Sequence, residues 1–257
     1  MLYSYTLEEA NNLTELPIPP SHEGLVFDGW NWDLEDVQAL TYPMDIGACY
    51  QTDDGSTRFY VRIDENLNSL KLSINLNGSY EIDWGDGTEK ETITLEEGSL
   101  NYVRPSTHTY VNYGDYVIKV KLLSGEAEIR QNPFYNSNQD YYYAQKAIKK
   151  VEVGQIQMAE DAFKDCFELS NVSMPNNCLL KNSCFYHTGL KFIVIPKNNI
   201  KIPNNSFGEC YQLIKLSLNN NLTEIGSECF YKIPVSDIKI GNKITTIASK
   251  SFHNSYL

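Results

Sequence analysis

A repeat of 22 to 23 residues runs through the second half of the chain and restricts the possible folds more than any other feature. Its clearest marker is a phenylalanine preceded by a small residue, in segments such as AEDAFKDC and PNNSFGEC. The markers are Phe163, Phe185, Phe207, Phe230 and Phe252, separated by 22, 22, 23 and 22 residues. Each repeat of this length is one small unit that buries its apolar face against its neighbours, which predicts a solenoid.

An apolar triplet recurs between the phenylalanines in the same register. The triplets are Ile148, Val151 and Val153; Leu169, Val172 and Met174; Leu190, Ile193 and Ile195; Leu213, Leu216 and Leu218; and Val235, Ile238 and Ile240. The last two members of each triplet are separated by a single residue. This spacing predicts a short strand with both apolar side chains on one face. Turn-forming residues follow, in MPNN, IPKNN, LNNN and IGNK.

These repeats resemble the BspA-like leucine-rich repeats of bacterial surface proteins, whose unit runs roughly A-F-x-x-C-x-x-L-x-x-I-x-L-P. Segments 162–175 (AFKDCFELSNVSMP) and 206–218 (SFGECYQLIKLSL) match this unit closely. The second repeat departs from it with His187 near the cysteine position, and the fourth with Lys232 and Ile233. The resemblance implies about five repeats over residues 131–257, in a solenoid of the right-handed β/α superhelix type.

The strand face of such a solenoid is its usual binding surface, so the resemblance also implies where a ligand would bind. The outward strand residues, expected to be exposed, are Ser173, Val194, Lys215, Ser217 and Lys239. The alternative is that all five are ordinary solvated positions.

The six cysteines form no CxxC pair and no Cys/His cluster with zinc spacing. Cys166 and Cys210 occupy one repeat position two coils apart, and Cys184 and Cys229 occupy another. Their expected separation of about 10 Å exceeds the reach of a disulfide. We therefore expect buried free thiols that act as small apolar residues.

Alternating apolar and polar residues in the middle of the chain predict antiparallel strands. The segment LKLSINL is followed by Asn77-Gly78, a strong hairpin turn signal, and then by the alternating segment SYEIDW. A further segment, GDYVIKVKL, alternates in the same way. We interpret these as half-buried strands of a small sandwich.

The stretch EIDWGDGTEK (81–90) is compatible with a tight turn, a calcium-binding loop or a pair of catalytic carboxylates. Its glycines permit positive φ, and the Asp86 carboxylate can accept hydrogen bonds from the turn's own amides. Paired catalytic carboxylates lie across a cleft, whereas Asp83 and Asp86 are three residues apart. We favour the turn, with calcium at Asp83 and Asp86 as the alternative.

The turn and the residues after it resemble the PKD domain, an immunoglobulin-like sandwich with a W-G-D-G-T turn, then H-x-Y, then G-x-Y-x-V. The matching residues are Trp84, Gly85, Asp86, Gly87, Thr88, His108, Tyr110, Gly114, Tyr116 and Ile118. The resemblance implies a PKD-like β-sandwich over residues 49–130, in which these residues are structural.

Residues 16–32 (LPIPPSHEGLVFDGWNW) resemble the closing half of the Listeria-Bacteroides repeat, a small β-grasp module whose opening half is not recognisable here. We expect residues 1–48 to form a small N-terminal module of strand and irregular structure, with one short helix near 34–40. Trp30 and Trp32 are candidates for stacking on sugar rings, and positions in the core are the alternative.

The formal net charge of −12 disfavours nucleic acid and anionic membrane surfaces as partners. The sequence contains no run of about 18 apolar residues, which is the length needed to cross a bilayer. The first residues have no basic or apolar region of a signal peptide. We therefore expect a protein that acts inside a cell or particle, or a fragment of a longer exported one.

Together these features predict a mainly β, multi-domain protein that is not an enzyme and uses no cofactor or metal. No phosphate-binding loop is present, and the four histidines lie in separate units without a nucleophile beside them. The BspA-like resemblance implies an adhesin-like protein at a bacterial surface, which binds a protein or glycan on host or neighbouring cells. The order of the pieces, with YQTDDGSTRFYVRI before the W-G-D-G turn, also resembles modular proteins in prophage regions of gut bacteria. The alternatives are a phage or prophage tail component that recognises the host, and a carbohydrate-binding accessory module.

The repeats end at SFHNSYL without a polar segment to cap the last unit. We expect either truncation at this point or end-to-end self-association through the last repeat.

Overall fold

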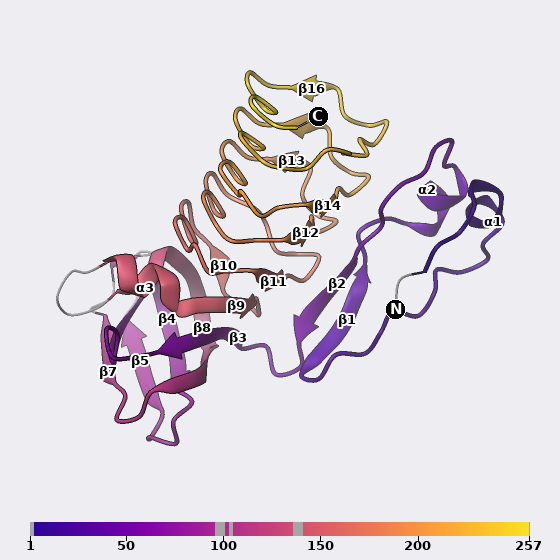
Figure 1. Cartoon of the computed structure of the whole chain (residues 1–257). Helices are drawn as coiled ribbons and strands as arrows, with labels where there is room; N and C mark the ends of the chain where they lie inside the picture. The colour runs from indigo at the N-terminus through magenta and orange to yellow at the C-terminus, as the bar shows by residue number, and fades with distance from the viewer. Residues whose placement is uncertain (1–2, 96–100, 103–104, 136–140, 257) are drawn as a thin grey trace.

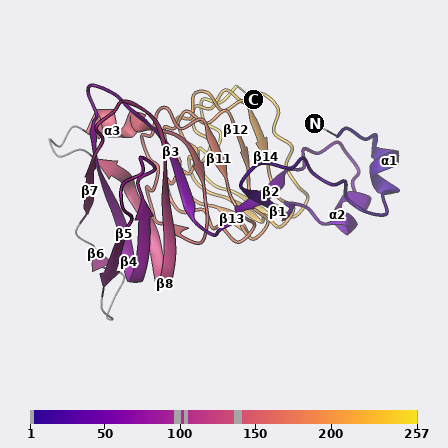
Figure 2. The same cartoon turned by 90° about the horizontal axis from the view of Figure 1, so that it is seen from below.

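Three parts of the chain are distinguishable in the computed structural model, which describes residues 3–95, 101–102, 105–135 and 141–256. A stack of coils rises from a curved sheet, and a small N-terminal part lies beside the coils (Figure 1). The view from below shows the sheet, the coils and the N-terminal part following one another (Figure 2). The elements are mainly strands and turns, which confirms the mainly β fold. No described helix is long and apolar enough to cross a bilayer.

The N-terminal part contains two short helices and a pair of antiparallel strands. These are α1 (Leu7–Asn11), β1 (Leu25–Trp30), α2 (Leu34–Gln38) and β2 (Ala48–Thr52). The helix predicted near 34–40 is confirmed by α2. We did not predict α1, although the sequence carries a signal for it. Thr6 and Glu9 form a capping box, in which each side chain accepts a hydrogen bond from the other's backbone N–H.

The middle part is built of antiparallel strands, as the alternation predicts. They are β3 (Thr57–Ile63), β4 (Ser69–Asp83), β5 (Glu91–Leu95), β6 (Asn101–Tyr102), β7 (Ser106–Thr109) and β8 (Gly114–Tyr135). β4 pairs with β8 and also with β5, β6 and β7. Apolar residues of the alternating segments, such as Leu72, Ile74 and Ile82, are fully buried.

Asn77 and Gly78 do not form the predicted hairpin turn, because both lie inside the continuous strand β4. Gly78 faces Gly125 of β8, and both have positive φ, at 123° and 75°. The strands approach so closely that a Cβ on Gly125 would lie 1.8 Å from the carbonyl oxygen of Asn77. Glycine here permits a close contact between strands, and pairing with β8 overrides the local preference for a turn.

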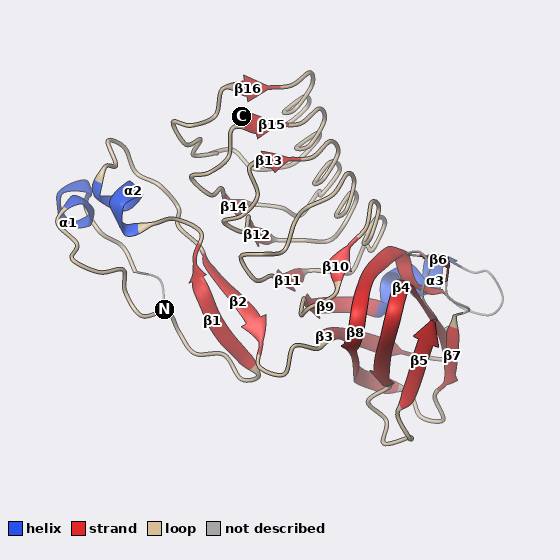
Figure 3. Cartoon of the chain, turned by 180° about the vertical axis from the view of Figure 1, so that it is seen from behind, coloured by secondary structure: helices blue, strands red, loops and turns tan. Residues whose placement is uncertain are grey.

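One hydrogen-bonded sheet joins the middle part to the coils (Figure 3). β9 (Ile148–Glu152) pairs antiparallel with β3, and β11 (Asn171–Ser173) pairs parallel with β9. β10 (Gln157–Met158) pairs parallel with β8. The middle part therefore covers the first coil, and this end of the solenoid is closed by strands rather than by a polar cap.

Residues 130–140 (RQNPFYNSNQD) are polar and aperiodic, which predicts a linker or the entry to the first repeat. β8 continues through this region as far as Tyr135, and residues 136–140 lie outside the described part of the chain. The short helix α3 (Tyr141–Ala147) then leads into β9.

Two ladders of short parallel strands run along the coils. The first contains β9 and β11, followed by β12 (Phe192–Val194) and β14 (Lys215–Ser217). The second contains β13 (Lys201–Ile202), β15 (Glu224–Ile225) and β16 (Thr246–Ile247). β11, β12 and β14 coincide with the strands predicted from the apolar triplets.

The expected β/α type of solenoid is wrong, because the coils contain no α-helix within the described residues 148–256. The chain around each stacked phenylalanine forms turns instead. In the third complete coil, Asn205 and Glu209 adopt left-handed φ values of 56° and 58°. Their backbone N–H groups, and that of Phe207, donate hydrogen bonds to the next coil. Amides that point along the solenoid axis cannot form the i→i−4 bonds of a helix.

The five repeated phenylalanines stack in one column through the coils. Neighbouring ring centroids are 5.4 to 5.8 Å apart, and the ring planes lie within 16° of parallel. The middle part extends this column, since the ring of Phe59 lies 6.4 Å from Phe163 and 5.1 Å from Phe134. The core of the coils and the core of the middle part are therefore continuous.

Phe134 is a further repeat position that the sequence analysis missed. It follows Ile129 by five residues, the same spacing that separates each later phenylalanine from an apolar residue before it. Ile129 pairs with Met158 as the later coils pair with one another. The signal was hidden because Phe134 and Phe163 are 29 residues apart rather than 22.

All six cysteines are free and buried, as predicted. Burial raises the pKa of the Cys184 thiol to about 12 and that of Cys210 to about 11. The Cys210 thiol donates a hydrogen bond to the Phe185 carbonyl at 3.0 Å. These groups are neutral fillers of the core at neutral pH.

Candidate functional site

The N-terminal part lies against the strand face of the coils. Three of its side chains donate hydrogen bonds of 2.7 to 3.3 Å to backbone carbonyl groups of the coils. Asn31 donates to Ile195 and Ser217, Trp32 to Leu218, and Tyr42 to Ile240. Since Ile195, Leu218 and Ile240 hold the same position in successive repeats, the contacts recur with the spacing of the coils.

Opposite charges accompany these hydrogen bonds. The ion pairs are Asp33 with Lys197, Asp45 with Lys215, and Asp36 with Lys243, at N–O distances of 2.5 to 3.3 Å. Each pair is partly exposed and therefore contributes at most about 1 kcal/mol. In addition, the Asp28 carboxylate accepts a hydrogen bond from the backbone N–H of Asn176. The charges thus orient the N-terminal part more than they strengthen its attachment.

Because the N-terminal part lies on the strand face, it contacts some of the residues that were predicted to form an exposed binding face. Ser217 is buried, in contrast to the expectation, because the N-terminal part covers it. Its hydroxyl donates to the Asp45 carbonyl at 2.6 Å and accepts from the Asn31 amide at 3.0 Å. Lys215 is exposed but pairs with Asp45. Both residues therefore contact the chain itself.

Of the other three predicted residues, two lie together and the third lies apart from them. Ser173 and Val194 line a cleft at the first coils. Gly47 approaches Val194 so closely that a Cβ on the glycine would lie 2.5 Å from the valine methyl groups. Lys239 lies further along the solenoid and pairs with Asp237 at 2.7 Å.

The two tryptophans proposed for sugar stacking have different environments. Trp32 is buried in the small core of the N-terminal part, and its indole N–H donates to the coils, so it has no face available for a sugar. Trp30 is half-buried, and its indole N–H donates to the Pro17 carbonyl at 3.1 Å. Trp32 thus occupies a position in the core.

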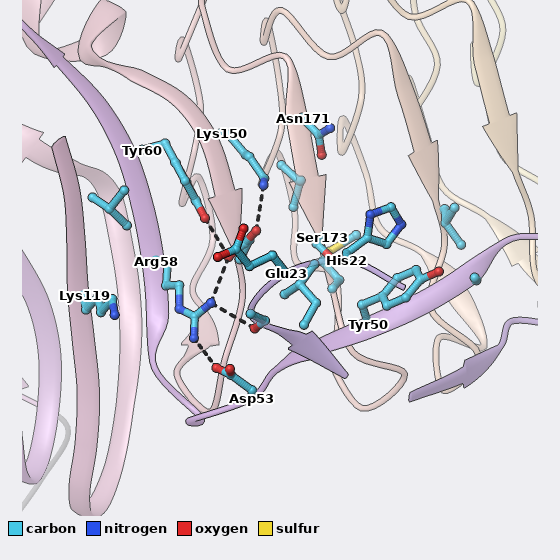
Figure 4. Close-up of a pocket in the computed structure, with 18 of the residues that line it drawn as sticks. His22, Glu23, Tyr50, Asp53, Arg58, Tyr60, Lys119, Lys150, Asn171 and Ser173 are labelled. Carbon is cyan, nitrogen blue, oxygen red and sulfur yellow. Dashed lines mark hydrogen bonds and ion pairs between the residues drawn. The ribbon is translucent and has the colours of Figure 1, made fainter. Parts of the chain in front are cut away.

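A cleft of about 740 Å³ lies where the three parts of the chain meet (Figure 4). Its walls come from β1 and β2 of the N-terminal part, β3 and β8 of the middle part, and β9, β11 and β12 of the coils. This volume is within the range of about 300 to 1,000 Å³ that is typical of small-molecule sites. The cleft is our candidate functional site.

A buried carboxylate, Glu152, forms the centre of the cleft. One of its oxygens accepts from the Lys150 ammonium at 2.7 Å, and the other accepts from the Tyr60 hydroxyl at 3.1 Å. The ammonium also lies 4.5 Å from the centroid of the Tyr60 ring. Burial and the nearby Glu152 charge raise the pKa of Tyr60 to about 12, so its hydroxyl remains a donor at neutral pH.

Arg58 joins the N-terminal part to the middle part at one side of the cleft. Its guanidinium donates to the Gly24 carbonyl at 2.9 Å and to the carboxylates of Asp53 and Asp54. Burial opposes ionisation of Asp54, but hydrogen bonds from Ser56 and the Arg58 charge outweigh it. They hold the pKa of Asp54 well below its usual range. These contacts keep the wall of the cleft in place.

The remaining lining is aromatic and neutral polar. The rings of His22 and Tyr50 meet edge to face at 4.8 Å, and the Tyr50 hydroxyl donates to a backbone carbonyl of the N-terminal part. Phe192 is 46% exposed. Asn171 lies on β11, directly beside Lys150 of β9 (Figure 4). The cleft thus combines aromatic surface with groups that can donate and accept hydrogen bonds.

The W-G-D-G stretch has the geometry of the predicted turn. Gly85 and Gly87 have positive φ, at 81° and 85°. The Asp83 carboxylate accepts from the Gly85 N–H at 2.9 Å, and the Asp86 carboxylate accepts from the Thr88 N–H at 3.1 Å. Both aspartates, the alternative calcium ligands, therefore bind groups of the turn itself.

The residues around this turn also contact one another. His108 lies 2.7 Å from the Asp86 carboxylate and stacks on Trp84 with a centroid distance of 5.0 Å. The Tyr110 hydroxyl donates to the Trp84 carbonyl at 3.0 Å. Within the part of the chain that the structure describes, no group of three or more His, Cys, Asp or Glu side chains is placed to hold a metal ion.

The sequence analysis did not identify the central residues of the cleft. Arg58, Tyr60 and Glu152 come from segments that are far apart in the sequence, TRFYVRI and IKKVEV. Their charged or polar members alternate with apolar residues, as in any half-buried strand. The available signal was a charged residue within each strand, which does not distinguish a buried network from a solvated face.

One comparison with known proteins gives a match. The family model described as BspA type Leucine rich repeat region (6 copies) matches residues 127–257. The match begins within β8 and so includes Ile129 and Phe134, ahead of the five units expected from the sequence. Searches of the curated proteins and of the solved structures give no match.

Proposed function

Since the chain belongs to the family of BspA-type leucine-rich repeat proteins, we propose that it is a non-catalytic recognition protein of a bacterial surface. Proteins of this family are often surface proteins that take part in interactions. The proposed partner is a protein or glycan on a host or neighbouring cell. The proposed location is extracellular, on a bacterium of the gut.

The cleft between the three parts is the observation that supports this function best. The cleft lies at the first coils, where Ser173 and Val194 of the strand face line it. The rest of that face, at Ser217 for example, contacts the N-terminal part. A partner would therefore bind at the first three coils rather than along the whole solenoid.

The other two parts have supporting roles in this proposal. The middle part, which we assign as PKD-like from its Trp84 to Thr88 turn, closes the end of the solenoid and supplies β3 and β8 to the cleft. The N-terminal part, which we assign as a partial Listeria-Bacteroides repeat, supplies the opposite wall.

A binding experiment with intact surfaces tests this function. The purified chain carries a fluorophore and is added to epithelial cells, immobilised matrix proteins and mucin. We expect saturable binding to at least one of them, and a loss of at least tenfold in Ser173→Arg, which fills the cleft with a long charged side chain. Lys239→Ala is the matched control, because Lys239 lies on the same face outside the cleft. Absence of saturable binding on every surface would contradict the proposal.

A further inference from the structure

The chemistry of the cleft identifies a class of ligand, an inference that rests on the proposed recognition function. The cleft combines features that few ligands match. It has a volume of about 740 Å³, aromatic side chains from all three parts of the chain and a polar centre.

The lining of the cleft has balanced charge. Its basic residues are Arg58, Lys119 and Lys150, and its acidic residues are Glu23, Asp53 and Glu152. Arg58 and Lys150 are paired with acidic groups, as described above. The protein as a whole carries a formal charge of −12. A strongly anionic ligand such as a nucleic acid or a polyphosphate would meet no excess of positive charge here.

One aromatic ring of the cleft, that of Tyr50, is held in a fixed orientation. Tyr50 is fixed at both ends, since its hydroxyl donates to the Pro20 carbonyl at 2.8 Å and its ring contacts His22 at 4.8 Å. Phe192 adds a partly exposed ring from β12. Rings that are already ordered lose little conformational entropy when a ligand packs on them.

The polar groups offer both donors and acceptors at short spacing. The Asn171 side chain has two donors and two acceptor lone pairs, and the Ser173 hydroxyl can donate or accept. The Lys150 ammonium donates to Glu152 and retains further N–H donors. A ligand with several hydroxyl groups, each able to donate and accept, matches such a set.

We propose that the cleft binds a neutral saccharide. A sugar ring has an apolar C–H surface that can pack on Tyr50 or Phe192, and hydroxyl groups that can bind to Asn171, Ser173 and Lys150. The volume accommodates a short oligosaccharide. Because the walls come from all three parts of the chain, the bound saccharide would also hold the N-terminal part against the coils.

The test is calorimetric titration of the full chain with members of a neutral oligosaccharide library, preselected on a glycan array that also carries the sialylated forms. We expect a neutral glycan to bind, with a five- to tenfold loss of affinity in Asn171→Ala and in Phe192→Ala. Ile214→Ala is the matched control, because Ile214 is an exposed apolar residue of a neighbouring coil outside the cleft. Its affinity should equal that of the unmodified chain.

Hydrogen exchange supplies a second readout that does not depend on the variants. Saccharide binding should slow exchange at residues 22–25 and 171–173 together, since both line the cleft. Three outcomes would overturn the inference: a preference for sialylated glycans, an equal loss of affinity in Ile214→Ala, or binding to cell surfaces that persists while every glycan fails. The last outcome leaves the proposed recognition function standing, whereas failure on both cells and glycans removes both.

Discussion

Individual residues of the coils adopt conformations that their side chains do not favour. Two residues beside each stacked phenylalanine, such as Asp161 and Asp165 around Phe163, have left-handed φ values of 56° and 61°. This conformation costs a non-glycine residue about 1 to 2 kcal/mol. Their backbone N–H groups donate to the next coil at 3.0 and 2.9 Å, which offsets that cost. The strain is therefore part of how one coil binds the next.

At the residue scale, Asp86→Asn tests the structural role of the W-G-D-G turn. Burial opposes ionisation of Asp86, but hydrogen bonds from Thr88 and His108 outweigh it and lower its pKa. A carboxyl with a lowered folded-state pKa stabilises the protein fully above its unfolded pKa of about 3.9, and this stabilisation is lost as the pH falls further. We expect the variant to lose about 1 to 2 kcal/mol at pH 7.

Urea unfolding between pH 7 and pH 2.5 measures this loss, and the difference between variant and unmodified chain should shrink below about pH 4. Parallel runs with calcium and with a chelator address the alternative assignment of Asp83 and Asp86. We expect the same unfolding midpoint in both. Stabilisation by calcium that disappears in Asp86→Asn would show that the turn is a metal site.

At the scale of elements, the phenylalanine column holds successive coils in register. Each ring inside the column stacks between the ring above and the ring below, so a coil buries its ring fully only when the next coil is present. Phe59 and Phe134 provide the neighbours for the first ring, which makes the middle part the cap of the column. Cooperative unfolding of the middle part and the coils follows from this continuity.

Phe207→Ala tests the column at its centre. Phe207 is fully buried, and its ring centroid lies 5.7 Å from that of Phe185 and 5.8 Å from that of Phe230. We expect a loss of about 3 to 5 kcal/mol in the free energy of unfolding, because the substitution leaves a cavity between two rings. Urea denaturation followed by circular dichroism measures it.

The control for this prediction is Tyr211→Ala. Tyr211 lies in the same coil but is 52% exposed, so its loss should cost less than about 1 kcal/mol. Equal effects of the two substitutions would show that the column contributes no more than a surface ring.

At the scale of the whole molecule, the N-terminal part and the coils form one assembly. Its contacts join residues that are up to about two hundred positions apart, such as Tyr42 and Ile240. The row of equivalent carbonyl groups on successive coils is a regular set of acceptors, and Asn31, Trp32 and Tyr42 supply donors to it. The cleft exists because this docking places β2 opposite β11.

Trp32→Phe tests the docking, since it keeps an aromatic ring and removes the donor to the Leu218 carbonyl. A buried acceptor left without a partner costs about 1 to 3 kcal/mol. We expect faster proteolysis and faster hydrogen exchange in residues 25–47, with the coils unaffected. Trp30→Phe is the matched control, because its indole donates within the N-terminal part, to Pro17. Identical behaviour of the two variants would argue against docking through Trp32.

The coils could be predicted from the sequence alone because their residues repeat at a regular interval. The phenylalanine spacing, the apolar triplets and the cysteine positions could be interpreted from one repeat to the next, since each repeat has neighbours of the same kind. The strands β11, β12 and β14 and four of the buried thiols, those of Cys166, Cys184, Cys210 and Cys229, were predicted in this way. Phe134 belongs to the same pattern but escaped detection, because a longer interval separates it from Phe163.

Tertiary structure alone decided the features that depend on contacts between different parts of the chain. It placed Asn77-Gly78 inside β4, covered Ser217 with the N-terminal part, and assembled Arg58, Tyr60 and Glu152 into one cleft. Such contacts occur once and leave no period in the sequence, so local preferences could not reveal them. The physical reason is that a repeat specifies its own neighbours, whereas a docking surface is specified by a partner segment elsewhere in the chain.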